Sequence, residues 1–181
     1  MHDLERDIEV SKRIWNSTTG VFEEETLKLF TNYLAENPDW LVIDFGSHIG
    51  QYTLFAAKMG HHVISVEPFH DSLLRIHKAS HLEHTQNKIV LINNAISNRR
   101  REVRQLNYEL ENIGGQSLLD LSGGNKFKFA IPDTEKHKYS VETILIDDIV
   151  EHIPKNRDER PYEKCMIKIG RHYFFGNFIY L

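Results

Sequence analysis

Three short, continuous apolar runs in the first half of the chain alternate with segments of helical periodicity. The runs cover residues 40–43, 62–66 and 89–92, and helices are expected between them over 51–58 and 71–84. A strand that is apolar along its whole length is buried on both faces, which is typical of parallel sheets covered by helices. The order strand, helix, strand, helix, strand builds such a sheet through right-handed crossovers. We therefore expect an α/β fold with a Rossmann-like, doubly wound sheet.

The pattern changes after Asn94, where predicted strands are separated by the glycine pairs Gly114-Gly115 and Gly123-Gly124. Closely spaced strands with such turns indicate an antiparallel excursion from the parallel sheet. A fourth apolar run then returns to the core. Outside the first unit, helices are expected over 3–15 and 23–36, and strands over 102–109, 127–131, 139–146 and 164–169.

Composition and charge exclude several classes of protein. The 181 residues are 40% hydrophobic and 27% charged, which is ordinary for one globular domain. A net charge of −4 gives no basic face for nucleic acid. The one basic run, residues 99–104, is interrupted by Glu102 and followed by Glu109 and Glu111, so we interpret it as a solvated turn rather than a phosphate site.

Neither a disulfide framework nor a metal site is predicted. The single cysteine, Cys165, lies in an apolar run and is expected to be buried. His77, His81 and His84 fall on one helical face, but spacing supplies no carboxylate or cysteine to complete a ligand set. The charged N-terminus lacks the apolar core of a signal peptide, and no apolar stretch reaches the roughly 20 residues of a membrane span. A soluble, cytoplasmic protein is the default expectation.

The turn from Asp44 to Gly50 lies between the first apolar strand and the first helix of the alternating unit. Ligands of doubly wound sheets bind at such carboxyl ends of strands. Gly46 and Gly50 allow a tight bend and close approach of a ligand, with Ser47 and His48 between them. The free amides at the start of the helix can receive a carboxylate. The sequence therefore predicts a cofactor loop here.

The charge at the mouth of this loop favours one cofactor over another. Asp44 would repel the pyrophosphate of a dinucleotide, and the middle glycine of G-x-G-x-x-G is absent because Ser47 and His48 follow Gly46. The ammonium and sulfonium of S-adenosylmethionine would instead be attracted to a carboxylate. We therefore predict S-adenosylmethionine as cofactor, and an NAD-dependent oxidoreductase is the less favoured alternative.

Two further residues are candidates for cofactor binding. Glu67 ends the second strand about 20 residues after the first glycine, where a carboxylate can accept hydrogen bonds from ribose hydroxyls. Asn94, at the end of the third strand, could offer an amide to an adenine edge, although asparagine at a strand end is more often a turn residue. No general base is identified. His48 lies in the cofactor loop and could approach a substrate, but a side chain that points to solvent is the favoured expectation. Asp147 and Asp148 are expected to cap a short helix.

These residues resemble a known family, the FkbM-type S-adenosylmethionine-dependent methyltransferases, from about Gly20 to Ile169. The resemblance implies the class I methyltransferase fold, S-adenosylmethionine as methyl donor, and an oxygen acceptor in a small molecule or glycan. The segments that carry it are Val42–Thr53, which resembles motif I, Val66–Phe69, Asn94–Ser97, Asn112–Ser117 and Glu142–Asp148.

The chain departs from that family after its fourth core strand. The family pattern K-I-D-x-E-G is replaced by Lys168-Ile169-Gly170-Arg171-His172, so both carboxylates are missing. We therefore expect N-terminal helices over 1–37, an incomplete methyltransferase domain over 38–169 that is truncated after the fourth strand, and a divergent aromatic tail over 170–181. The strand at 164–169 would then be a sheet edge. A non-catalytic fragment that retains cofactor binding is the alternative to an active methyltransferase.

Overall fold

The computed structural model describes residues 1–109, 111–119, 131, 133–154, 162, 164–169 and 172–177. Its main sheet has five strands in the order β3-β2-β1-β7-β8. The first four run parallel, and β8 runs antiparallel to β7. The predicted α/β fold is thus confirmed. The strands are β1 (Leu41–Phe45), β2 (Val63–Val66), β3 (Ile89–Ile92), β7 (Lys164–Ile169) and β8 (His172–Asn177).

The expectation that the strand at 164–169 forms a sheet edge is wrong. β8, which lies in the aromatic tail, pairs with β7 along its whole length, from Lys164↔Asn177 to Ile169↔His172. The physical reason is that β7 would otherwise leave a row of unpaired backbone groups, and an adjacent segment rich in tyrosine and phenylalanine readily forms a strand. The sheet therefore continues past its fourth strand.

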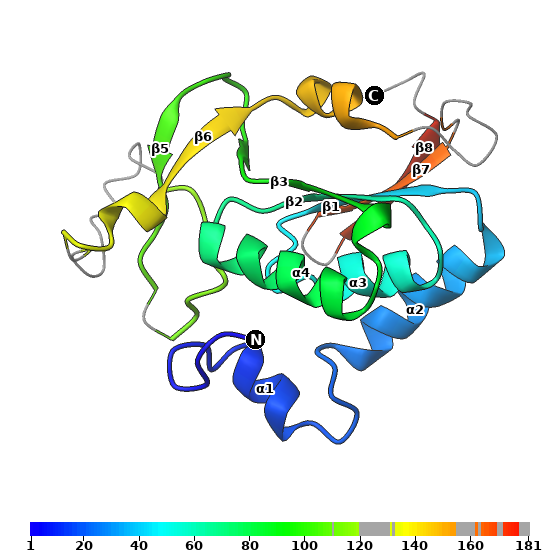
Figure 1. The fold of residues 1–181 in the computed structure, drawn as a ribbon, viewed down its shortest axis with the longest axis horizontal. Helices are drawn as coiled ribbons and strands as arrows, with labels where there is room; N and C mark the ends of the chain where they lie inside the picture. The colour runs from blue at the N-terminus through cyan, green and yellow to red at the C-terminus, as the bar shows by residue number, and fades with distance from the viewer. Residues whose placement is uncertain are drawn as a thin grey trace.

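Three helices, α2 (Glu24–Glu36), α3 (Gln51–Lys58) and α4 (His70–Leu82), lie on one side of the main sheet (Figure 1). Side chains alternate along β1: Val42 packs against α2 and α3, whereas Leu41, Ile43 and Phe45 belong to a second core cluster. That second cluster includes Ile149 of η3 (Ile146–His152), a 3-10 helix. Asp44 shares the face of Val42 and is therefore directed toward α3.

The predicted helix over residues 3–15 is mostly absent. Only α1 (Ser11–Asn16) is helical, and Asp7 forms an antiparallel bridge with Asn112. The cause is local, because the Asp3 carboxylate accepts the backbone N–H groups of Glu5 and Arg6. Such side-chain bonds compete with helix formation. The other predicted helices agree with the structure to within two residues at each end.

A smaller sheet contains the predicted excursion. Its order is β4-β6-β5, with β5 antiparallel and β4 parallel to β6, so the excursion is mixed rather than purely antiparallel. Its strands are β4 (Ala95–Ile96), β5 (Val103–Gln105) and β6 (Ser140–Ile144); two further 3-10 helices are η1 (Gln86–Lys88) and η2 (Lys136–Tyr139). Residues 127–130 of the predicted strand at 127–131 lie outside the described residues.

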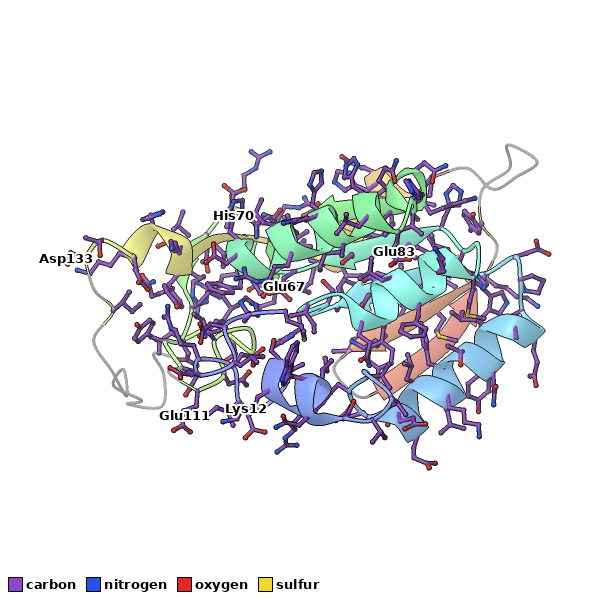
Figure 2. All side chains as sticks on the ribbon, turned by 60° about the horizontal axis from the view of Figure 1, so that its bottom comes forward. Lys12, Glu67, His70, Glu83, Glu111 and Asp133 are labelled. Carbon is purple, nitrogen blue, oxygen red and sulfur yellow. The ribbon has the colours of Figure 1, made fainter. Side chains whose placement is uncertain are left out.

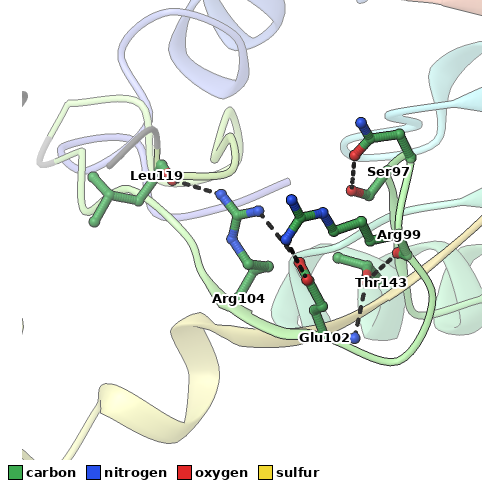
Figure 3. A network of polar contacts seen from close by, with 7 residues as sticks. Ser97, Arg99, Glu102, Arg104, Leu119 and Thr143 are labelled. Carbon is green, nitrogen blue, oxygen red and sulfur yellow. Dashed lines mark hydrogen bonds and ion pairs between the residues drawn. The ribbon is translucent and has the colours of Figure 1, made fainter. Parts of the chain in front are cut away.

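The basic run beside this sheet is a salt-bridged surface turn, as the sequence predicts. Arg99 and Arg104 both contact the Glu102 carboxylate, at 3.2 and 3.7 Å (Figure 3). Arg100 pairs with Asp148, whose carboxylate also accepts the backbone N–H of Leu145 at the start of η3. The predicted capping role of Asp148 is thereby confirmed. Three of the four arginines of this segment, Arg99, Arg100 and Arg104, are therefore paired with carboxylates rather than free to bind phosphate.

Candidate functional site

The turn between β1 and α3 folds over the end of β2. The backbone N–H groups of Gly46 and Ser47 both donate to the carbonyl of Val66, at 2.9 and 3.3 Å. Gly46 and Gly50 have φ values of +69° and +82°, in the region that favours glycine. A Cβ at Gly50 would lie 2.7 Å from Ile76 Cγ1, whereas a Cβ at Gly46 would meet no atom of the described residues within 4 Å. The two glycines thus serve different purposes: Gly50 allows packing on α4, and Gly46 leaves space open above the turn.

Glu67 is bound directly to this turn. Its carboxylate accepts the backbone N–H of His48 at 2.7 Å and that of Phe69 at 2.8 Å. The side chain is only 2% exposed. Burial raises the pKa of Glu67 to about 8, although the two backbone hydrogen bonds act in the opposite direction. A carboxyl group therefore stands at the carboxyl end of β2, next to the glycine turn, as the spacing predicts.

The Asp44 carboxylate contacts two buried side chains of the same chain. Its Oδ1 lies 2.8 Å from Lys168 Nζ, and its Oδ2 accepts a hydrogen bond from Thr53 Oγ1, also at 2.8 Å. Asp44 is fully buried. Because Lys168 already compensates its charge, the preference for a cationic methyl donor over a dinucleotide cannot rest on Asp44 alone.

Sequence reasoning missed Lys168. It lies in β7, is 4% exposed, and faces Asp44 directly in the register of the two parallel strands. Its Nζ also lies 4.5 Å from the centre of the Tyr52 ring, a cation–π contact. The available signal was a second lysine in β7: Lys164 begins the strand and is exposed, whereas Lys168 interrupts its buried apolar run near the carboxyl end.

His48 is enclosed, so the expectation that it points to solvent is wrong. Both of its ring nitrogens are shielded from solvent, and its ring centroid lies 6.0 Å from that of His2. A Cβ at Gly114 would collide with the His48 ring. Burial is also the main reason why the pKa of His48 is lowered. The segments that enclose His48 are remote in sequence, which is why the loop pattern did not reveal them.

A cover made of two segments lies over this end of the sheet; we call residues 1–14 together with 111–116 the N-terminal cover. The backbone N–H of Ile8 donates to the carbonyl of Glu111, and the backbone N–H of Ile113 donates to the carbonyl of Arg6. The ring of His2 lies 6.0 Å from the rings of both His48 and Phe69, and its Nε2 is 2.9 Å from Ser72 Oγ. His48 and Phe69 are the two residues whose amides hold Glu67. Figure 2 labels Glu67 between α4 and the segment that carries α1.

The remaining predicted site residues divide between the loop and the second sheet. Ser47 is 4% exposed, and its buried hydroxyl has no hydrogen-bond partner among the described residues. Asn94 donates to the carbonyl of Glu142, 3.0 Å away in β6, and so contacts the smaller sheet. Its neighbour Asn93 donates to the carbonyls of Glu67 and Pro68, at 2.9 and 3.1 Å. The structure thus brings Asn93, rather than Asn94, against the backbone of the Glu67 segment.

Comparisons with known proteins find similarity only among solved structures. No family model and no curated protein matches the chain. The similar structures include an S-adenosylmethionine-dependent methyltransferase from Geobacter sulfurreducens in complex with S-adenosyl-L-homocysteine, which is 17% identical over 52% of this chain and 41% of that chain, with a TM-score of 0.37. An RNA methyltransferase from Salinibacter ruber in the same kind of complex is 13% identical over 41% of this chain and 49% of that chain, with a TM-score of 0.38.

A third similar structure is an S-adenosylmethionine-dependent methyltransferase from Agrobacterium tumefaciens. It is 19% identical over 41% of this chain and 25% of that chain, with a TM-score of 0.38. The chain therefore spans between a quarter and a half of the length of these proteins. The likeness concerns part of the fold only. The resemblance to the FkbM-type family stays a prediction.

Two searches of the described residues bear on other classes of site. No group of three or more histidine, cysteine, aspartate or glutamate side chains is arranged there to hold a metal ion. Within the same part of the chain, no helix combines the length and the apolar character that crossing a bilayer requires.

Proposed function

We propose that the chain is an S-adenosylmethionine-dependent methyltransferase that transfers a methyl group to a hydroxyl oxygen of a small molecule or glycan. The observation that carries the proposal is the hydrogen bond of 2.7 Å between the His48 amide and the Glu67 carboxylate. It joins the glycine turn after β1 to the carboxylate after β2. In doubly wound sheets, a glycine turn after the first strand and an acidic residue about 20 residues later commonly bind a ribose-bearing ligand.

The residues present fit such a donor. Each Glu67 oxygen accepts one backbone N–H and retains a second lone pair for a ribose hydroxyl. The space above Gly46 is open, and the Ser47 hydroxyl beside it is buried without a partner among the described residues. Glu67 would hold the ribose, and the turn at Gly46 and Ser47 the methionyl part. When bound, the donor supplies an electrophilic methyl group on a sulfonium.

The N-terminal cover must move before a donor can bind. Glu67 is only 2% exposed, and the His2 ring packs on both residues whose amides hold it. Methyl transfer is an in-line displacement, so the protein contributes mainly orientation and exclusion of water. A cover that opens for the donor and closes over it would provide both.

A second candidate function, donor binding without methyl transfer, is favoured by the segment after β7. An oxygen acceptor needs a base or a hydrogen-bonding carboxylate to raise its nucleophilicity. The sequence between β7 and β8 is Gly170-Arg171, and neither residue is acidic. β7 is followed by β8, which pairs antiparallel with it, and not by a crossover connection to another parallel strand.

Calorimetric titration with S-adenosylhomocysteine and with NAD⁺ separates these functions from an oxidoreductase. We expect binding of S-adenosylhomocysteine, weaker binding to the Glu67→Gln variant, and no binding of NAD⁺. Transfer of radiolabelled methyl to a panel of hydroxyl acceptors then distinguishes turnover from binding alone. Binding of NAD⁺ in preference to S-adenosylhomocysteine would refute the proposed function.

A further inference from the structure

The hydrogen bond between Asp44 and Thr53 spans the base of the glycine turn. Asp44 precedes Gly46 at the end of β1, and Thr53 follows Gly50 in the first turn of α3. Their side chains meet at 2.8 Å, and both are fully buried. Inside the turn, the Gly50 amide donates to the Ser47 carbonyl at 2.8 Å. The turn is therefore closed at its base by Asp44 and closed internally by its own backbone.

Lys168 makes this closure possible. A buried carboxylate is strongly destabilised unless a cation and hydrogen bonds accompany it. Lys168 Nζ, 2.8 Å away on the neighbouring strand, is the cation that contacts Asp44 among the described residues. The Tyr52 ring, from α3, holds the ammonium from a second side. Lys168 therefore links β7 to both ends of the turn.

We propose that Lys168 is a positioning residue of the donor site: by neutralising Asp44 it holds the 46–50 turn in the shape that presents Gly46, Ser47 and Glu67 to the donor. This inference rests on the proposed function for its consequence in donor binding. Its structural part, the closure of the turn, can be tested without any ligand.

Asp44 and Lys168 also shift the pKa of Glu67, in opposite directions. The negative charge of Asp44 raises the pKa of Glu67, and the positive charge of Lys168 lowers it. Two histidines lie next to this carboxyl or to the residues that bind it: Glu67 accepts a hydrogen bond from the backbone N–H of His48, and the His2 ring of the N-terminal cover packs on His48 and Phe69. A ribose hydroxyl bonds best to an ionised carboxylate, so donor affinity should rise with pH as Glu67 ionises. Removing Lys168 should move this rise to higher pH, and removing the charge of Asp44 should move it to lower pH.

The ligand-free test is hydrogen exchange of the amides of residues 46–50. In Lys168→Met, we expect exchange of the His48 and Gly50 amides to accelerate by about tenfold or more. The matched control is Lys164→Met, on the exposed end of the same strand, which should leave these rates unchanged. The double variant Asp44→Asn/Lys168→Met removes both charges, and we expect it to restore most of the protection.

The ligand test is the affinity for S-adenosylhomocysteine between pH 6 and 9.5. We expect the pH at the midpoint of the rise in affinity to be higher than in the wild type in Lys168→Met and lower in Asp44→Asn. In the double variant it should return toward the wild-type value. If Lys168→Met fails to fold, Lys168→Arg and the double variant still decide the outcome, since both keep the buried site electrically balanced. Normal exchange of residues 46–50 in Lys168→Met, or no recovery in the double variant, would overturn the inference. Failure of the wild type to bind S-adenosylhomocysteine would instead overturn the proposed function, and the exchange rates would still decide the role of Lys168.

Discussion

Alanine at Gly50 should damage folding, whereas alanine at Gly46 should damage binding. At Gly50 the substitution imposes two costs: a left-handed backbone with φ of +82° and a Cβ only 2.7 Å from Ile76. The backbone term is about 1–2 kcal/mol, and overpacking adds about 1–3 kcal/mol. At Gly46 only the backbone term applies, because within the described part of the chain no atom lies within 4 Å of the new Cβ. Gly50→Ala should therefore lose about 2–5 kcal/mol of unfolding free energy, and Gly46→Ala about 1–2 kcal/mol.

Urea unfolding followed by tryptophan fluorescence measures this difference, since the half-buried Trp40 lies immediately before β1. With a urea dependence of about 1–3 kcal/mol/M, the midpoint of Gly50→Ala should fall by about 1–2 M. Calorimetry with S-adenosylhomocysteine supplies the second readout. Gly46→Ala should bind at least about tenfold more weakly while remaining the more stable of the two, because its methyl group occupies the space proposed for the donor. Equal destabilisation by the two substitutions, or undiminished binding by Gly46→Ala, would refute this reasoning.

Three further predictions concern pH and the edge of the sheet. The pKa of Glu67 is about 8 in the folded state, above its ordinary value of 4.5, so between these pH values the folded state holds a proton that the unfolded chain releases. The free energy of unfolding should therefore fall by up to about 1.4 kcal/mol per pH unit as the pH rises from 4.5 to 8. The urea midpoints of Glu67→Gln should lack this slope. The pKa of His2 is lowered to about 3, mainly by burial and further by the charge of Arg75. Acid should therefore release the N-terminal cover as the pH falls from about 6.5 toward 3. Hydrogen exchange of the Ile8 and Ile113 amides should accelerate in that range, and unchanged exchange would argue against this prediction. Deleting residues 171–181 exposes β7 as an edge, so light scattering should detect aggregation that the full chain does not show, and a monodisperse variant with the same melting temperature would contradict this.

The parallel core was predictable because its signals are local. Apolar runs such as Ile89–Ile92, and the turn chemistry around Gly46 and Gly50, depend on neighbours close in sequence. The position of Glu67 was predictable for a similar reason, since the end of β2 is marked by the proline that follows it. These features define both the fold class and one side of the candidate site.

The parts that the sequence did not reveal depend on contacts between distant segments. Lys168 reaches Asp44 from a strand more than a hundred residues away, and His2 covers residues of the second βα unit. Neither contact leaves a periodic signal. The helix expected at 3–15 failed because the Asp3 turn and the bridge to Asn112 outweighed helical periodicity. The pairing of β8 was missed because resemblance to a family gives no information about a segment that departs from it.

The central claim is that the Glu67 carboxylate holds the ribose of a methyl donor beside the 46–50 turn. A crystal structure of the chain with S-adenosylhomocysteine tests it most directly. We predict both ribose hydroxyls within about 2.6–3.0 Å of the Glu67 oxygens, with the His2 ring moved away from its position over His48 and Phe69. A ligand bound elsewhere, or one whose ribose makes no contact with Glu67, would contradict the account.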